Sequence, residues 1–110
     1  MDGIYLFNYS GSADAGFALL VFQNGKITGA DVGNVLYDGT YAHVSGFSIV
    51  VDLILDVPPH GQVVQGVSKP HAWKLPIRGE FPWPLPEGAA LPILTEVGPV
   101  TVTFKKLRVL

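Results

Sequence analysis

The sequence predicts an all-β fold, a small up-and-down meander β-barrel of about eight antiparallel strands. Apolar and polar residues alternate over strand-length segments that are separated by turn residues, which is the pattern of half-buried strands. Thirteen glycines suit tight connections between neighbouring strands, and no segment has convincing helical periodicity. A closed barrel is favoured because closure removes exposed sheet edges. At 110 residues, the chain is expected to form a single domain, residues 1–110.

The first two expected strands differ in how they distribute their apolar residues. In residues 4–9, three aromatic residues share one face: Tyr5, Phe7 and Tyr9. Residues 16–23 are instead apolar on both faces, with Phe17, Leu19 and Val21 opposite Ala18, Leu20 and Phe22. Since only one face can point into a barrel, we expect Phe17, Leu19 and Val21 to contact a second copy. The sequence therefore predicts a homodimer.

Turn residues divide the first half of the chain further. Four dipeptides are predicted to be turns: Asn24-Gly25, Gly33-Asn34, Asp38-Gly39 and Ser45-Gly46. Asn24-Gly25 is the strongest signal, because a type I′ turn needs positive φ at both central residues. Expected strands follow over residues 26–30, 40–44 and 47–57.

Prolines shape the second half of the chain. Pro58-Pro59 ends the longest strand, because proline donates no hydrogen bond to a strand ladder. Pro76 indicates an edge strand or a bulge. Residues 81–86 carry proline at every second position, which favours polyproline II or an irregular loop. The last strand begins near Val100, and Lys105-Lys106 breaks its alternation, so we expect a β-bulge there.

The composition limits the classes of function. Hydrophobic residues make up 48% of the chain, charged residues only 15%, and the mean hydropathy is +0.36. Such an apolar surplus suits a binding cavity or a subunit interface. A sequence pI of 5.8 speaks against direct nucleic-acid binding, which usually needs a basic surface. No secretory signal or membrane span is visible, and the absence of cysteine excludes disulfides, so we expect a cytoplasmic protein.

No recognisable catalytic or metal-binding motif is present. The three histidines have no metal-ligand spacing, and neither a nucleophile elbow nor a phosphate-binding loop occurs. Asp52 and Asp56 share one strand face, which we interpret as a pair of solvated carboxylates. We therefore predict a non-enzymatic protein with no catalytic residues, no metal and no cofactor.

Aromatic residues are the main candidates for a binding pocket. Eight of them are placed where they can line the barrel interior: Tyr5, Phe7, Tyr9, Tyr37, Tyr41, Phe47, Trp73 and Trp83. From these we take five as the ligand-pocket candidates: Tyr5, Phe7, Tyr41, Phe47 and Trp73. Ordinary core packing is the alternative interpretation, since pockets in barrels are also mostly apolar.

Three motifs resemble the GrlR-like family of negative regulators of type III secretion genes in bacteria. They are Asp2-Gly3-Ile4-Tyr5, the run Asn24-Gly25-Lys26-Ile27-Thr28-Gly29-Ala30-Asp31, and Tyr37-Asp38-Gly39-Thr40-Tyr41. The resemblance implies a lipocalin-like barrel that forms a homodimer and sequesters a transcriptional activator. The family's acidic loop is absent, because this chain has Ala42-His43-Val44-Ser45-Gly46 there, so the contact with the activator is not carried over.

Two hypotheses of function follow. The leading one is a regulatory protein that binds a protein partner, as the resemblance implies. The alternative is a calycin-type carrier that holds a small apolar ligand inside the barrel.

Overall fold

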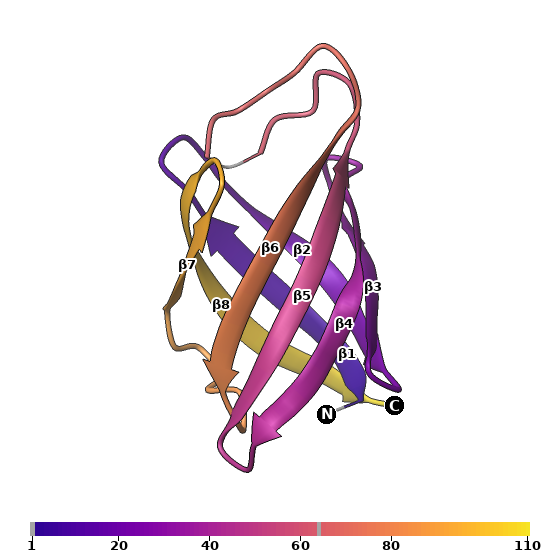
Figure 1. Ribbon diagram of the computed structural model, residues 1–110, viewed down its shortest axis with the longest axis vertical. Coiled ribbons are helices and arrows are strands. Elements are labelled where there is room, and N and C mark those ends of the chain that lie inside the picture. The colour runs from indigo at the N-terminus through magenta and orange to yellow at the C-terminus, as the bar shows by residue number, and fades with distance from the viewer. Residues whose placement is uncertain (1, 64) are drawn as a thin grey trace.

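The protein forms one antiparallel sheet of eight strands, rolled into a nearly closed barrel (Figure 1). The computed structural model describes residues 2–63 and 65–110, and no helix occurs among them. The strands are β1 (Gly3–Ser10), β2 (Ala15–Gln23), β3 (Lys26–Asp31), β4 (Leu36–Ser45), β5 (Ser48–Val57), β6 (Trp73–Pro82), β7 (Leu91–Thr95) and β8 (Gly98–Val109). The predicted all-β meander of eight antiparallel strands is confirmed.

The order of the strands shows how the barrel closes. Sequence neighbours pair from β1 to β6 and again between β7 and β8, while β8 joins β1, giving the order β6-β5-β4-β3-β2-β1-β8-β7. The two edge strands, β6 and β7, lie next to each other with no ladder between their described residues (Figure 1). Pro76 in β6 and Pro92 in β7 suit these edges, where a missing N–H breaks no ladder. The edge position predicted from Pro76 is confirmed.

The barrel interior is filled differently at its two ends. Five rings pack at the middle and lower end, and we call them the aromatic plug: Tyr5, Phe7, Phe22, Phe81 and Phe104. Phe7 and Phe104 pack edge to face with their ring centroids 4.2 Å apart. The ring centroids of Tyr5 and Phe22 are 4.9 Å apart. The other buried residues of β5, β6 and β8 are aliphatic.

Two of the predicted turns are confirmed. Asn24 and Gly25 both have positive φ, 53° and 79°, as a type I′ hairpin requires. They join β2 to β3, with Gln23 opposite Lys26. Gly33-Asn34 lies in the connection between β3 and β4, and Asn34 has a φ of 63°.

The other two turn predictions were wrong. Asp38-Gly39 lies inside β4, which is longer than the predicted strand. Gly39 is needed for a close approach instead, because a Cβ there would collide with the Asp52 carbonyl oxygen on β5. The predicted Ser45-Gly46 turn is formed one residue later, by Gly46 and Phe47, because the register of β4 shifts between His43 and Ser45.

The second half agrees with the sequence in part. β5 ends at Val57, directly before the prolines. The bulge in β8 is present, with Leu107 as the extra residue between the partners of Ile4 and Tyr5. β7 was not recognised as a separate strand, because its five residues include a proline. Of the proline-rich segment 81–86, the first two residues finish β6 and the other four lie outside the strands.

Candidate functional site

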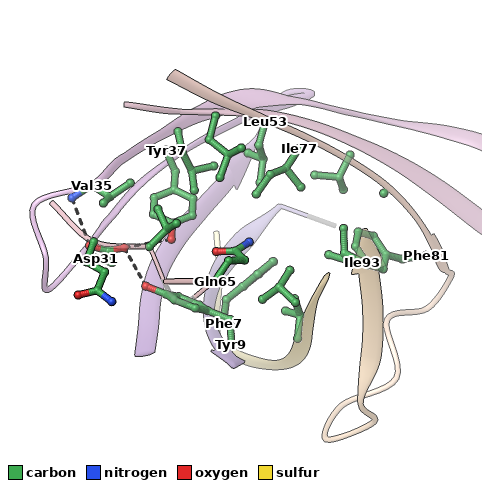
Figure 2. Close-up of a pocket in the computed structure, with 18 residues that line it drawn as sticks. Phe7, Tyr9, Asp31, Val35, Tyr37, Leu53, Gln65, Ile77, Phe81 and Ile93 are labelled. Atoms are coloured by element: carbon green, nitrogen blue, oxygen red, sulfur yellow. Dashed lines mark hydrogen bonds between the residues drawn. The ribbon is translucent and has the colours of Figure 1, made fainter. Parts of the chain in front are cut away.

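A cavity of about 90 Å³ lies inside the barrel. Its walls come mainly from inward residues of β5, β6 and β8, because alternate residues of a strand point to the same face. Six of these wall residues are aliphatic: Val51, Leu53, Leu55, Leu75, Ile77 and Val102. Phe7 and Phe81 of the aromatic plug contribute to the lining as well (Figure 2).

A long loop crosses the upper end of the barrel (Figure 1). We call residues 58–72 the capping loop; Val64 lies outside the described residues. Val63 is buried, with 7% of its surface exposed, and both Val63 and Gln65 line the cavity. Ser12 Oγ donates to the Gln65 carbonyl oxygen at 3.2 Å, and Gln65 Nε2 donates to Thr95 Oγ1 at 3.2 Å. These bonds tie the loop to the β1–β2 connection and to the end of β7.

A carboxylate and two phenols form the polar end of the cavity. Asp31, the last residue of β3, accepts hydrogen bonds at Oδ2 from the hydroxyl groups of Tyr9 (2.7 Å) and Tyr37 (3.1 Å). Its Oδ1 accepts from the backbone N–H groups of Gly33 (2.8 Å) and Val35 (3.2 Å). We call Tyr9, Asp31 and Tyr37 the tyrosine–aspartate cluster. Figure 2 shows it at one side of the cavity, across from Phe81 and Ile93.

The surroundings keep both phenols protonated. Burial raises the pKa of Tyr37 far above its ordinary value of 10, and hydrogen bonding and charge from Tyr9 and Asp31 act in the same direction. Burial also raises the pKa of Tyr9, with Asp31 adding to the effect. Near neutral pH each phenol therefore has one proton to donate, and each donates it to Asp31.

Among the described residues that line the cavity, Asp31 is the only one with a charged side chain, and none is a lysine, arginine or histidine. The negative charge is compensated by hydrogen bonds alone, which gives the polar end a negative potential.

The cavity includes one of the five predicted pocket residues, Phe7. Tyr5 is part of the aromatic plug, whereas Tyr41 and Trp73 are half-buried and do not line the cavity. Lys69 Nζ lies 4.4 Å above the Trp73 ring. The pocket prediction for Phe47 was wrong: this residue lies in the β4–β5 turn with 84% of its surface exposed. Phe47 continues the alternation of the inward residues of β5, but it precedes Ser48, the first residue of β5 that pairs with β4.

Sequence reasoning missed the residues that make the site polar. Tyr9 and Tyr37 belong to the wider set of eight aromatic residues, and strand parity placed Tyr9 on the inner face. Asp31 had a detectable signal, because it ends a strand just before a turn and can accept from that turn's N–H groups. No sequence pattern indicates Gln65 as a site residue, since its position depends on how the capping loop crosses the barrel.

The predicted dimer residues lie on the outer face of β2. Phe17 and Leu19 are 44% and 47% exposed, and Val21 is half-buried. On the neighbouring strand β1, Leu6 lies opposite Leu19 and Ile4 lies opposite Val21. Outward-facing apolar residues therefore form a patch across two strands.

The charged residues of β5 and β6 pair with each other on the outer surface. Arg78 lies 3.1 Å from Asp52, and Lys74 lies 2.7 Å from Asp56. These pairs are exposed, so they add little stability. Among the described residues, no three histidine or acidic side chains are grouped as a metal site would require. Those residues also include no helix of the length and hydrophobicity that would cross a membrane.

Fold and cavity together define a small antiparallel β-barrel with an apolar interior space and one polar end. No family model matches the chain, and neither a curated protein nor a solved structure is significantly similar to it. The resemblance to the GrlR-like family therefore rests on the sequence motifs and stays a prediction.

Proposed function

We propose that this protein is a non-enzymatic binding protein whose barrel holds a small, largely apolar molecule. The observation that carries the proposal is the combination of an aliphatic cavity with one polar end. Binding sites for small molecules have this composition, with a few placed polar groups among apolar walls. The capping loop supports the proposal, because a ligand beneath it would be shielded from water. A cytoplasmic location belongs to the same proposal.

Xenon provides a direct test, because this apolar atom enters dry cavities. We expect dissolved xenon to shift the methyl NMR signals of Val51, Leu53 and Leu55. Leu55→Phe fills the cavity and should abolish the shifts. Ile54→Phe adds a ring on the outer face of the same strand and should leave them unchanged. Absence of xenon-induced shifts in the wild-type protein would contradict the proposal.

Native mass spectrometry of freshly purified protein tests whether a molecule is carried. We expect added mass on the wild-type chain and on Ile54→Phe, and none on Leu55→Phe. Equal adducts on all three proteins would place the molecule outside the cavity.

A second candidate function is protein binding by a regulatory homodimer. It is favoured by the outer patch around Phe17 and Leu19 and by the family resemblance. Leu19→Asp should convert a dimer to a monomer in sedimentation experiments at micromolar concentration. Val32→Asp, in the exposed β3–β4 turn, is the control and should remain dimeric. A monomeric wild-type protein would contradict this candidate.

A further inference from the structure

The hydroxyl protons of the two tyrosines at the polar end of the cavity are already used. The Asp31 carboxylate has about four lone-pair sites, and it accepts four hydrogen bonds. Each phenol has a single proton, and both protons point to Asp31. The oxygens of Tyr9 and Tyr37 can therefore only accept further hydrogen bonds. For a ligand, this part of the cavity is a surface of acceptors.

Gln65 adds a third acceptor. Thr95 Oγ1 donates its only proton to the Gly98 carbonyl oxygen at 2.6 Å. It must then accept from Gln65, which fixes the amide nitrogen of Gln65 towards Thr95 at 3.2 Å. Gln65 Oε1 accepts no hydrogen bond from any other described residue. Figure 2 shows the Gln65 side chain inside the cavity, between the tyrosine–aspartate cluster and Ile93.

The charge at this end favours a cation. Asp31 is negative, and the described lining residues include no positive side chain to balance it. A ligand carboxylate would meet like charge from Asp31, whereas an ammonium group brings opposite charge. The amides of Gln62 and Gln65 keep N–H groups that could donate to a ligand, so the charge of Asp31 decides the preference. A primary ammonium has three N–H donors, enough for the oxygens of Tyr9, Tyr37 and Gln65. Hydrogen bonds between a charged group and its partner are also stronger than neutral ones.

The size of the cavity limits the rest of the ligand. Its volume of about 90 Å³ is several times the roughly 10–15 Å³ that one water molecule needs on the same measure. It is smaller than the cavity of about 150 Å³ that holds benzene in another protein. Such a space suits a short unbranched carbon chain better than an aromatic ring.

We propose that the cavity selects a short aliphatic primary amine, with its ammonium group at Tyr9, Tyr37 and Gln65 and its chain between the aliphatic walls. This inference rests on the proposed function, since it names the ligand class of the same cavity. It predicts a ranking in which the amine binds most tightly, the alcohol of equal length binds more weakly, and the carboxylate is excluded.

The ranking can be measured by NMR titration at neutral pH with n-butylamine, 1-butanol and butyrate. We expect butylamine to bind about tenfold more tightly than butanol, with its largest shifts at Tyr9 and Tyr37, and butyrate to cause no saturable shift. Butyrate binding as tightly as butylamine would overturn the inference. Equal affinity for butylamine and butanol would overturn it too.

Asp31→Asn is the most informative variant, because it reverses the direction of the hydrogen bonds with the two phenols. The asparagine oxygen can still accept from Gly33 and Val35, while its NH₂ group donates to the phenols. Both phenols are then free to donate into the cavity. We expect the affinity for butylamine to fall at least about tenfold and butyrate to gain saturable binding. Asp2→Asn, which changes a tyrosine-bonded aspartate outside the cavity, should leave the ranking intact.

Gln65→Leu keeps the inference testable if Asp31→Asn does not fold. Removing the third acceptor should weaken butylamine binding several-fold and leave xenon binding unchanged. An unchanged affinity for butylamine would overturn the role of Gln65. Xenon entry without butylamine binding would refute the amine inference alone, whereas absence of both would also refute the proposed function.

Discussion

The two ends of the barrel each contain tyrosine hydroxyls bonded to an aspartate, and the two sites have different surroundings. At the upper end, Asp31 accepts from Tyr9, Tyr37 and two backbone N–H groups beside the cavity. At the lower end, Asp2 accepts from Tyr41 at 2.6 Å and from the Asn24 N–H at 3.3 Å. The Tyr41 ring packs 5.2 Å from Phe22, next to the filled part of the barrel.

The comparison shows that a tyrosine hydroxyl bonded to an aspartate can have different roles in different surroundings. Both pairs link strands that are distant in sequence, and both aspartates belong to motifs that resemble the GrlR-like family. Tyr9, Asp31 and Tyr37 line the cavity, whereas neither Asp2 nor Tyr41 does. The lower pair therefore links strands, while the upper one also faces the cavity, where we propose that it presents acceptors to a ligand.

The largest expected effect comes from removing each aspartate. Asp31→Ala leaves two phenols and two backbone N–H groups without their acceptor, and should lower the free energy of unfolding by about 3 kcal/mol. Asp2→Ala should have a clearly smaller effect, because it removes the acceptor of only two described donors, the Tyr41 hydroxyl and the Asn24 N–H. Chemical denaturation of both variants measures the difference. Equal losses would show that the two ends are energetically alike.

Removing one hydroxyl from each site gives a smaller contrast. Tyr37 is only 8% exposed, and Tyr37→Phe removes a hydrogen bond to a charged group, so we expect a loss of about 1.5 kcal/mol. Tyr41→Phe should cost less, since its hydroxyl lies nearer to solvent. Thermal and denaturant unfolding of the two variants are suitable measurements, and a larger loss for Tyr41→Phe would contradict the comparison.

Alkaline titration tests the phenols of both ends, because burial raises the pKa of Tyr41 at the lower end as well as the pKa values of Tyr9 and Tyr37. Burial raises the pKa of Tyr9 and Tyr37 above the ordinary value of 10. The stability linked to these groups is complete below pH 10 and declines as the pH rises further, because the unfolded chain releases protons that the folded chain retains. Ultraviolet titration should show late ionisation, followed by unfolding. Tyr37→Phe should flatten the decline, and an unchanged profile would contradict this assignment.

The smallest effect is expected in acid at the lower end. The Tyr41 hydrogen bond lowers the pKa of Asp2 below its ordinary value of 3.8. A lowered pKa contributes stability that is present above the unfolded value and lost as the pH falls through the folded one. Wild-type protein should therefore lose slightly more stability below pH 3.8 than Asp2→Asn. Identical acid profiles would mean that this link does not affect folding.

The errors made from sequence have a common cause. Gly39 follows Asp38, and this dipeptide is typical of a turn. A glycine is needed there for another reason, because the backbone of β5 lies very close to it. Phe47 follows the alternation of β5, yet β5 and its pairing with β4 begin one residue later than predicted, at Ser48. In both cases the deciding contact comes from another strand, which local sequence does not reveal.

The sequence by itself determined the barrel. Alternating segments, the Asn24-Gly25 turn and the prolines each act locally, so their effects can be recognised without a fold. The inner face of β1 and the two-faced character of β2 followed from the same alternation.

Only the tertiary structure decided where the barrel is full and where it is empty. The cavity lies where aliphatic residues of β5, β6 and β8 meet beside the aromatic plug. Asp31, Tyr9, Tyr37 and Gln65 become one polar site because strand register and the path of the capping loop bring them together. The proximity of these residues depends on long-range packing, which no local sequence pattern indicates.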